Sequence, residues 1–248
     1  FPIEASTIDA VVITHAHIDH TGYLPKLVKE GFSGNVYCTE ATASLMHIML
    51  LDSAKLQDEE AEWARKKGYS KHDPPKPLYE TADAEKALEL LRSYSYEDKI
   101  DIIDRIAITF KNAGHIFGSA YVELSLFGDT QTKKIVFSGD LGRGSNPILF
   151  PPKPLEEADI LLIESTYGDR SNEVEDVESI LEKEVNKAID RGGVLLIPAF
   201  AVGRTQLLMH YLEKLMQKNA IPRIPIYIDS PMAINATEVY KKHPDYHR

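Results

Sequence analysis

The stretch VVITHAHIDH, residues 11–20, constrains this chain more than any other segment, because three histidines and an aspartate directly follow a run of β-branched residues. Buried imidazole and carboxylate groups must find partners or remain in contact with water. If the chain is extended where it leaves the strand, His15 and His17 point in the same direction and can bind one metal ion. Asp19 and His20 come one step later, at the start of a predicted helix, and can reach a second ion beside the first. The alternative, four loop or capping residues, is disfavoured by the length and density of the motif.

Two later residues are candidates for the same centre. His115 in NAGHIFGSA and Asp140 in VFSGDLG each follow an apolar run and lie among glycines. Sites are often built at strand ends of this kind. Taken alone, each would be interpreted as an ordinary loop residue, and only the first motif makes them candidate ligands.

Composition limits the class of protein. The single cysteine, Cys38, excludes an intrachain disulfide and a multi-thiolate zinc site, so a metal would bind through nitrogen and oxygen atoms. No run approaches the roughly 18 apolar residues of a membrane-spanning helix, so we expect a soluble, cytoplasmic protein with no membrane partner. The net charge of −10 argues against nucleic-acid binding by bulk electrostatics, but cations held by acidic ligands reverse the local field.

The hydrophobic pattern predicts a different organisation in successive parts of the chain. The first part reads as a strand, a helix from Thr21 to Glu30 and the strand NVYC. Residues 40–97 are charged and predicted to be largely helical, with a break at the loop KHDPPKP. They would form either a cover over the site or a solvated helical surface. Alternating residues from Asp101 to Gly139 predict a layer of strands.

From Asp159 onward the pattern changes again. The apolar runs ADILLIES, GGVLLIPAF and IPIYIDSP alternate with helices predicted near residues 173–190, 203–217 and 232–242. Such alternation is typical of a parallel βαβαβ arrangement.

These motifs resemble a known family. The order His-x-His-x-Asp-His, then Gly-His before small residues, then Ser-Gly-Asp closing a strand resembles the metallo-β-lactamase superfamily. ESTYGDR, PAFAVGRTQ and YIDSPMA are similar to the β-CASP branch of RNA-processing nucleases, the bacterial and archaeal relatives of the polyadenylation endonuclease. The resemblance implies an α/β fold. A partial metallo-β-lactamase αββα sandwich, lacking its first strands, would occupy residues 1–170, and the N-terminal part of a parallel α/β β-CASP domain would occupy residues 171–248.

The resemblance also implies a role for each site residue. Two zinc ions would be held by His15, His17 and His115 on one side, Asp19 and His20 on the other, and Asp140 as the bridge. Two such ions about 4 Å apart can hold a bridging hydroxide, align it on phosphorus and neutralise the charge that builds on the phosphoryl oxygens. Asp19 can also orient that hydroxide.

Glu164 and four later residues are the remaining candidates. Glu164 matches an acidic residue that in the family pairs with a later histidine to protonate the leaving oxygen; a strand-end helix cap is the alternative. Gly203, Arg204 and Gln206 lie where a predicted strand passes into a helix, so free N–H groups and a guanidinium could receive a backbone phosphate, unless this is a simple turn. Ser230 is a candidate RNA contact, but a helix cap explains it equally.

The chain departs from the family pattern at both ends. The strands that precede the first motif have no counterpart, and neither do two later histidines, one pairing with the acid and one completing the second zinc site. We assign neither role to His243 or His247. We therefore expect an internal fragment of a longer protein, which holds at least one zinc ion and whose activity in isolation is undecided.

The function implied for the parent protein is zinc-dependent hydrolysis of RNA, with single-stranded RNA as the partner. Two alternatives are a thioester or lactam hydrolase on the same scaffold, against which the motifs after Asp159 count, and a catalytically silent RNA-binding scaffold. The sequence does not determine endonuclease or exonuclease action, RNA or DNA preference, or the oligomeric state, a homodimer included.

Overall fold

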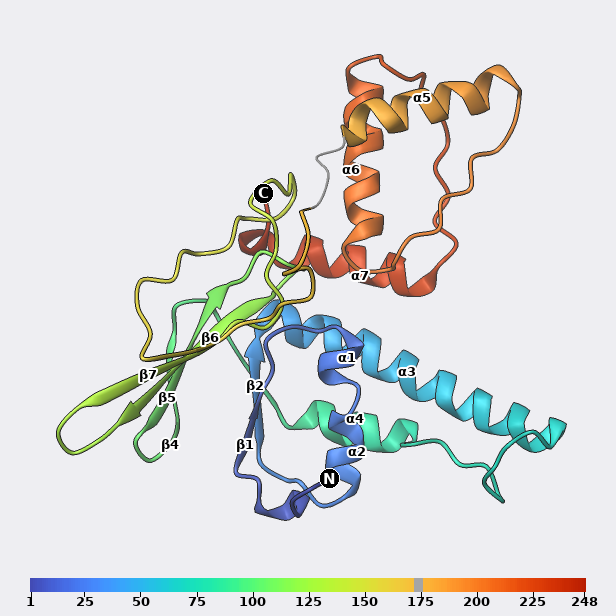
Figure 1. The fold of residues 1–248 in the computed structure, drawn as a ribbon. Coiled ribbons are helices and arrows are strands. Elements are labelled where there is room, and N and C mark those ends of the chain that lie inside the picture. The colour runs from blue at the N-terminus through green and yellow to red at the C-terminus, as the bar shows by residue number, and fades with distance from the viewer. Residues whose placement is uncertain (172–175) are drawn as a thin grey trace.

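The computed structural model describes residues 1–171 and 176–248 (Figure 1). Near the N-terminus, three parallel strands form a sheet in the order β1-β2-β3, made of β1 (Ala10–Val12), β2 (Asn35–Thr39) and β3 (Leu91–Tyr94). Parallel neighbours need crossover connections, which helices usually supply. The connecting helices are α1 (Ile18–Thr21), α2 (Leu24–Lys29), α3 (Glu40–Lys67) and α4 (Thr81–Glu89), and η1 (Ala5–Thr7) precedes β1. The predicted first strands are confirmed.

The helix predicted from Thr21 to Glu30 is interrupted in the structure. α1 ends at Thr21, and α2 begins at Leu24 with Pro25 in its first turn. Proline has no N–H to continue a preceding helix but fits the start of a new one. The break lets α1 carry Asp19 and His20 separately from the helix that packs into the core.

The second sheet has five strands in the order β4-β5-β6-β7-β8. It contains β4 (Lys99–Ile103), β5 (Ile106–Asn112), β6 (Ala120–Phe127), β7 (Thr132–Phe137) and β8 (Ile160–Leu162). The layer of strands predicted from Asp101 to Gly139 is confirmed; its four strands pair antiparallel, and β8 joins parallel to β7. Buried side chains from the two sheets meet in one cluster, including Tyr37 of β2 and Phe110 of β5. The two sheets therefore pack face to face.

Residues 40–97 supply part of the core, and the predicted solvated surface is found only in their middle, where most of residues 65–78 are exposed. Nine residues of α3 are buried, and six of them join the main cluster together with the three buried residues of α4. Thr39 caps α3 by accepting a hydrogen bond from the Thr42 N–H at 3.2 Å. The short strand β3 also lies in this segment, where a helix was predicted.

The C-terminal part contributes α5 (Val177–Asp190), α6 (Arg204–Gln217), α7 (Pro231–Lys242) and η2 (Pro244–Tyr246). These helices agree with the prediction, except that residues 173–175 of the first one lie outside the described residues. α5 and α6 share a small core, whereas α7 crosses α3 and adds Ala236, Val239 and Tyr240 to the main cluster (Figure 1). The fold is α/β, as predicted.

Two predicted strands are not formed. Among the described residues, GGVLLIPAF and IPIYIDSP belong to no sheet, although ADILLIES forms β8. Apolar, β-branched composition favours a strand only if a neighbour accepts its backbone hydrogen bonds, and these segments have no such ladder within residues 1–171 and 176–248. Val194 and Leu196 are consequently 91% and 86% exposed.

None of the helices within the described ranges is both long and apolar enough to cross a membrane.

Candidate metal centre

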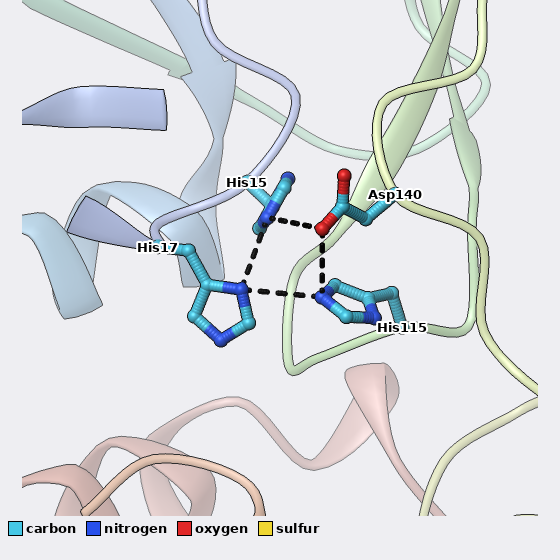
Figure 2. A group of neighbouring side chains, drawn as sticks. All are labelled: His15, His17, His115 and Asp140. Carbon is cyan, nitrogen blue, oxygen red and sulfur yellow. Dashed lines mark hydrogen bonds and ion pairs between the residues drawn. The ribbon is translucent and has the colours of Figure 1, made fainter. Parts of the chain in front are cut away.

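Four side chains from three separate loops converge at one point, and Figure 2 shows them pointing toward one another. His15 and His17 follow β1, His115 lies between β5 and β6, and Asp140 follows β7. One potential ligand atom from each residue lies within 4.8 Å of all the others. The two sheets therefore bring together residues that are more than 120 positions apart in the sequence.

The distances within this group fit a tetrahedral metal site. His17 Nδ1 lies 3.2 Å from both His15 Nε2 and His115 Nε2. Asp140 Oδ2 lies 3.7 Å from His15 Nε2 and 3.4 Å from His115 Nε2. Donors bound tetrahedrally to zinc at about 2.0–2.1 Å are separated from one another by about 3.4 Å. The four donors can therefore hold one metal ion without large rearrangement.

Burial keeps the three imidazoles neutral. It lowers the pKa of His15, which is fully buried, to about 2, and repulsion from the neighbouring histidines acts in the same direction. Burial also lowers the pKa of His17 and of His115, outweighing the opposing effect of the Asp140 carboxylate. Neutral imidazoles present lone pairs, and three of them converging beside a carboxylate make a donor set suited to a cation.

Short-range contacts fix the orientation of His15 and Asp140. Thr14 Oγ1 lies 3.1 Å from His15 Nδ1, which leaves Nε2 to face the cluster. Gly139, the residue before Asp140, has a φ of +53°, and a Cβ there would lie 2.8 Å from the Thr14 Cβ. Glycine is therefore required in Ser-Gly-Asp for the Asp140 loop to approach the β1 loop this closely.

The loop that carries His115, residues 113–119, is braced by hydroxyl groups. Ser119 Oγ accepts hydrogen bonds from the backbone N–H groups of His115 at 2.9 Å and Ile116 at 3.2 Å. The Gly118 carbonyl accepts from Thr39 Oγ1 at 2.7 Å and Thr42 Oγ1 at 2.9 Å. Thr39 and Thr42 were not predicted from the sequence, because hydroxyls nearly 80 positions from the loop leave no spacing pattern.

Asp19 and His20 lie beside Asp140, and the His20 ring is also next to that of His15, with centroids 4.1 Å apart. His20 Nε2 is 3.4 Å from Asp140 Oδ1 and 3.5 Å from Asp19 Oδ2. The two oxygens of Asp140 thus face different groups, because Oδ2 faces His15 and His115 while Oδ1 faces His20. The Asp19 carboxylate is largely exposed. The geometry places Asp140 between two sets of potential ligands.

Glu164 follows β8 and connects two loops. Its carboxylate accepts hydrogen bonds from the backbone N–H groups of Leu141 at 3.1 Å and Thr166 at 3.0 Å. These bonds hold the pKa of Glu164 below its usual range, so the carboxylate is charged at neutral pH. Leu141 adjoins Asp140, so Glu164 also helps to hold the Asp140 loop in place. A role in proton transfer stays a prediction.

The turn before α6 lies close to the His115 loop. Gly203 has a φ of +86°, and a Cβ there would lie 3.8 Å from Ile116 Cγ2. Its N–H donates to Gln206 Oε1 at 2.7 Å, and the N–H groups of Arg204 and Thr205 each donate to a carbonyl of the turn. The free N–H groups expected here are therefore already used. The Arg204 guanidinium remains exposed, 5.9 Å from the centre of the Phe200 ring.

The other two candidate RNA contacts have structural partners. Gln206 is buried, and its Nε2 donates to Ala201 O and to Thr237 Oγ1, both at 3.0 Å. Ser230 caps α7, since its Oγ accepts a hydrogen bond from the Ala233 N–H at 3.2 Å. RNA contact by either residue stays a prediction.

A His/Asp cluster at the edge of two face-to-face sheets, with helices against the first sheet, defines a layered α/β protein with a candidate metal centre. Residues 3–182 match the family described as the metallo-beta-lactamase superfamily, and residues 205–248 match the Beta-Casp domain. The first match covers more than half of the chain. The chain therefore belongs to the metallo-β-lactamase superfamily, in its β-CASP branch. The domain boundary at residues 170 and 171 stays a prediction.

Relatives of known description extend over nearly the whole chain. It is 38% identical over 244 residues to a ribonuclease of Thermus thermophilus, covering 98% of this chain and 51% of the ribonuclease. It is 37% identical over 251 residues to the transcription termination factor FttA of Methanosarcina mazei, covering 99% of this chain and 36% of the factor. An RNase J-like protein of Methanocaldococcus jannaschii is 32% identical over 247 residues, covering 97% of this chain and 52% of that protein. The chain thus spans about a third to a half of these relatives.

Proposed function

We propose that this chain forms the metal-binding part of a zinc-dependent ribonuclease that hydrolyses RNA phosphodiesters. The observation that carries the proposal is the four-donor group, because its spacing of 3.2–3.7 Å suits zinc and its imidazoles are neutral. Similarity to a ribonuclease and to an RNase J-like protein supports RNA as the substrate. The Beta-Casp match and these relatives count against a lactam or thioester hydrolase.

His15, His17, His115 and Asp140 would hold the first ion. Asp19, His20 and the second oxygen of Asp140 would hold part of a second site, and this arrangement supports the bridging role proposed for Asp140. Zn²⁺ bound here would act as a Lewis acid toward a phosphoryl oxygen and would lower the pKa of a bound water. The exposed carboxylate of Asp19 can orient the attacking water and accept its proton.

The substrate would lie across the exposed side of this cluster. Asp140 is partly exposed, and the turn that carries Arg204 adjoins Ile116, which follows His115 in the chain. The guanidinium of Arg204 can receive a backbone phosphate, which would position the RNA beside the metal. The proposed substrate is single-stranded RNA, whose unpaired bases can separate and contact the protein individually. We also propose that the protein acts in the cytoplasm.

Metal content tests the proposal first. Chain purified without chelator is expected to contain about one zinc per molecule by elemental mass spectrometry, or about two if the second site is completed. His15→Ala should lose the tightly bound ion, whereas His72→Ala, at an exposed histidine outside the cluster, should retain it. A wild-type chain that binds no zinc when zinc is supplied would contradict the proposal.

Cleavage of a labelled single-stranded RNA tests the reaction. Asp140→Asn should lower the rate by at least about 100-fold, because it removes one ligand charge from the centre, while RNA binding persists. A matched DNA strand separates RNA preference from general phosphodiester hydrolysis. If zinc and RNA both bind but a chain extended to the length of the relatives does not cleave, the protein is an RNA-binding scaffold.

A further inference from the structure

The loop that carries His115 is in contact with the C-terminal helix. Phe117, two residues after His115, is fully buried, and its ring stacks on that of Tyr240 in α7 with centroids 4.0 Å apart and planes at 19°. Tyr246 and His247 also pack on Phe117, at centroid distances of 5.9 and 5.8 Å. Aromatic stacking of this kind stabilises a contact beyond the effect of the area that it buries. The contact joins the β5–β6 loop to an element more than 100 residues later in the chain.

The opposite side of the same loop is fixed against α3. The Gly118 carbonyl accepts the two threonine hydrogen bonds described above, and Gly118 has a φ of +78°. A Cβ on Gly118 would lie 2.6 Å from the Thr42 backbone nitrogen, so only glycine allows the loop to approach α3 this closely. The loop is therefore wedged between the start of α3 and the ring of Tyr240.

The residues that follow α7 bind to the first part of the chain. His243 Nε2 lies 2.9 Å from Ser44 Oγ, and Tyr246 Oη donates to Glu40 Oε2 at 3.3 Å. The Arg248 N–H donates to the Ile148 carbonyl at 3.0 Å. These contacts set the position of Tyr240 relative to α3, so that Phe117 meets a ring that is itself held in place.

We propose that Phe117 and Tyr240 are positioning residues for the metal centre. Their stack clamps residues 113–119 from the side of α7, so that His115 Nε2 faces His15 and His17. His115 lies three residues after the end of β5, in the same loop as Phe117, so a contact that holds Phe117 also restrains His115. Metal ligands need support of this kind, since a displacement of about 1 Å weakens the site. The inference rests on the metal-binding function proposed above.

The Tyr240 hydroxyl provides a sharp control. It is buried, and it has no hydrogen-bond partner among residues 1–171 and 176–248. The clamp therefore depends on the ring rather than on the hydroxyl. Tyr240→Phe keeps the ring and removes an unsatisfied polar group, whereas Tyr240→Leu removes the stack. Tyr79→Leu is the matched variant elsewhere, because Tyr79 is a fully buried tyrosine of the same core cluster that contacts Ser53 of α3 at 2.9 Å.

Two readouts on the full chain test the clamp. Hydrogen exchange of the metal-free protein, followed by mass spectrometry, reports on residues 113–119, and competition with a chromogenic chelator gives the zinc dissociation constant. Tyr240→Leu should speed exchange of this loop and raise the zinc dissociation constant by at least about tenfold. Tyr240→Phe should match the wild type in both measurements. Tyr79→Leu should lower the midpoint of thermal unfolding and leave the loop and the zinc constant unchanged.

Three outcomes would overturn the clamp. These are unchanged loop exchange in Tyr240→Leu, an unchanged zinc constant in that variant, or an equal effect of Tyr79→Leu, which would show a general loss of stability. A wild-type chain that binds no zinc would contradict the proposed metal site itself. It would also overturn the proposal that the stack positions His115 for a metal. Loop exchange in the metal-free protein keeps these failures distinguishable, because it reports on the stack without any metal.

Discussion

The two parts of this molecule contain similar apolar runs, but they use them differently. In the first part, AITF and KIVF become strands β5 and β7, each hydrogen-bonded to neighbours. In the second, GGVLLIPAF remains outside any sheet among the described residues and exposes Val194 and Leu196 almost completely. Composition favours extended chain in both cases. The difference shows that a strand is decided by the partner that its backbone meets as much as by its own side chains.

The largest expected effect comes from breaking the core between the two sheets. Phe110 is fully buried and lies in the cluster that includes Tyr37 of the opposite sheet. Phe110→Ala should lower the free energy of unfolding by about 3–5 kcal/mol, because it removes the buried ring from the core and leaves a cavity. Urea unfolding, followed by circular dichroism, measures this loss. A loss below about 1 kcal/mol would mean that the sheets do not pack as described.

Some of the metal centre was predictable because its signals are local. His15, His17, Asp19 and His20 lie within six residues, and strand periodicity alone brings the first two together. His115 and Asp140 look like ordinary loop residues; the first motif made them candidate ligands, and the family resemblance gave them their specific roles. The structure places both beside His15, at 3.4–3.7 Å between the Asp140 carboxylate and the histidine nitrogens.

Other features could not be read from the sequence because they depend on distant residues. The strand β3, with the sequence LRSY, is short and half polar, and it is a strand because it pairs with β2. The contact of Phe117 with Tyr240 joins two ordinary core residues, which no spacing rule connects. Strand-like patterns after Asp159 correctly predicted β8 but overpredicted two further strands, since propensity says nothing about a missing neighbour.

Zinc should stabilise the first part of the molecule and leave the exposed apolar run of the second part unchanged. Free zinc at about 100 times its dissociation constant should stabilise the folded chain by about 2.7 kcal/mol, because only the folded state assembles the four donors. Thermal unfolding with zinc and with excess chelator measures the shift. Hydrogen exchange should slow at residues 113–119 and stay fast at 194–197. An equal shift in His15→Ala would place the zinc elsewhere.

Alkaline pH should weaken the first part through Cys38. This thiol is fully buried in the main core, and burial raises its pKa to about 12. In the unfolded chain the thiol ionises near pH 9, so its contribution is fully present below that pH and is lost as the pH rises toward 12. Between pH 8 and 10 the loss should be about 1.4 kcal/mol.

The cysteine effect is isolated by comparison with Cys38→Ala. Lysine and tyrosine side chains also titrate at these pH values, but they are common to both proteins. The wild type should therefore lose more stability than Cys38→Ala over the same interval, measured by urea unfolding at each pH. Native protein at pH 8 should also resist alkylation by iodoacetamide, and rapid labelling without denaturant would show that the core around Cys38 opens readily.

The smallest effect is expected where the apolar chain is exposed. Leu196 is 86% exposed, so Leu196→Ser removes little buried surface and should change the free energy of unfolding by no more than about 0.5 kcal/mol. The matched change at a buried leucine, Leu50→Ser in α3, should cost several kcal/mol, because it leaves a cavity and buries a hydroxyl. Similar losses at the two leucines would show that residues 194–197 are covered in solution, and the contrast between the two parts would then be wrong. If Leu196→Ser leaves the free energy of unfolding unchanged, an apolar sequence alone does not make this segment part of the core.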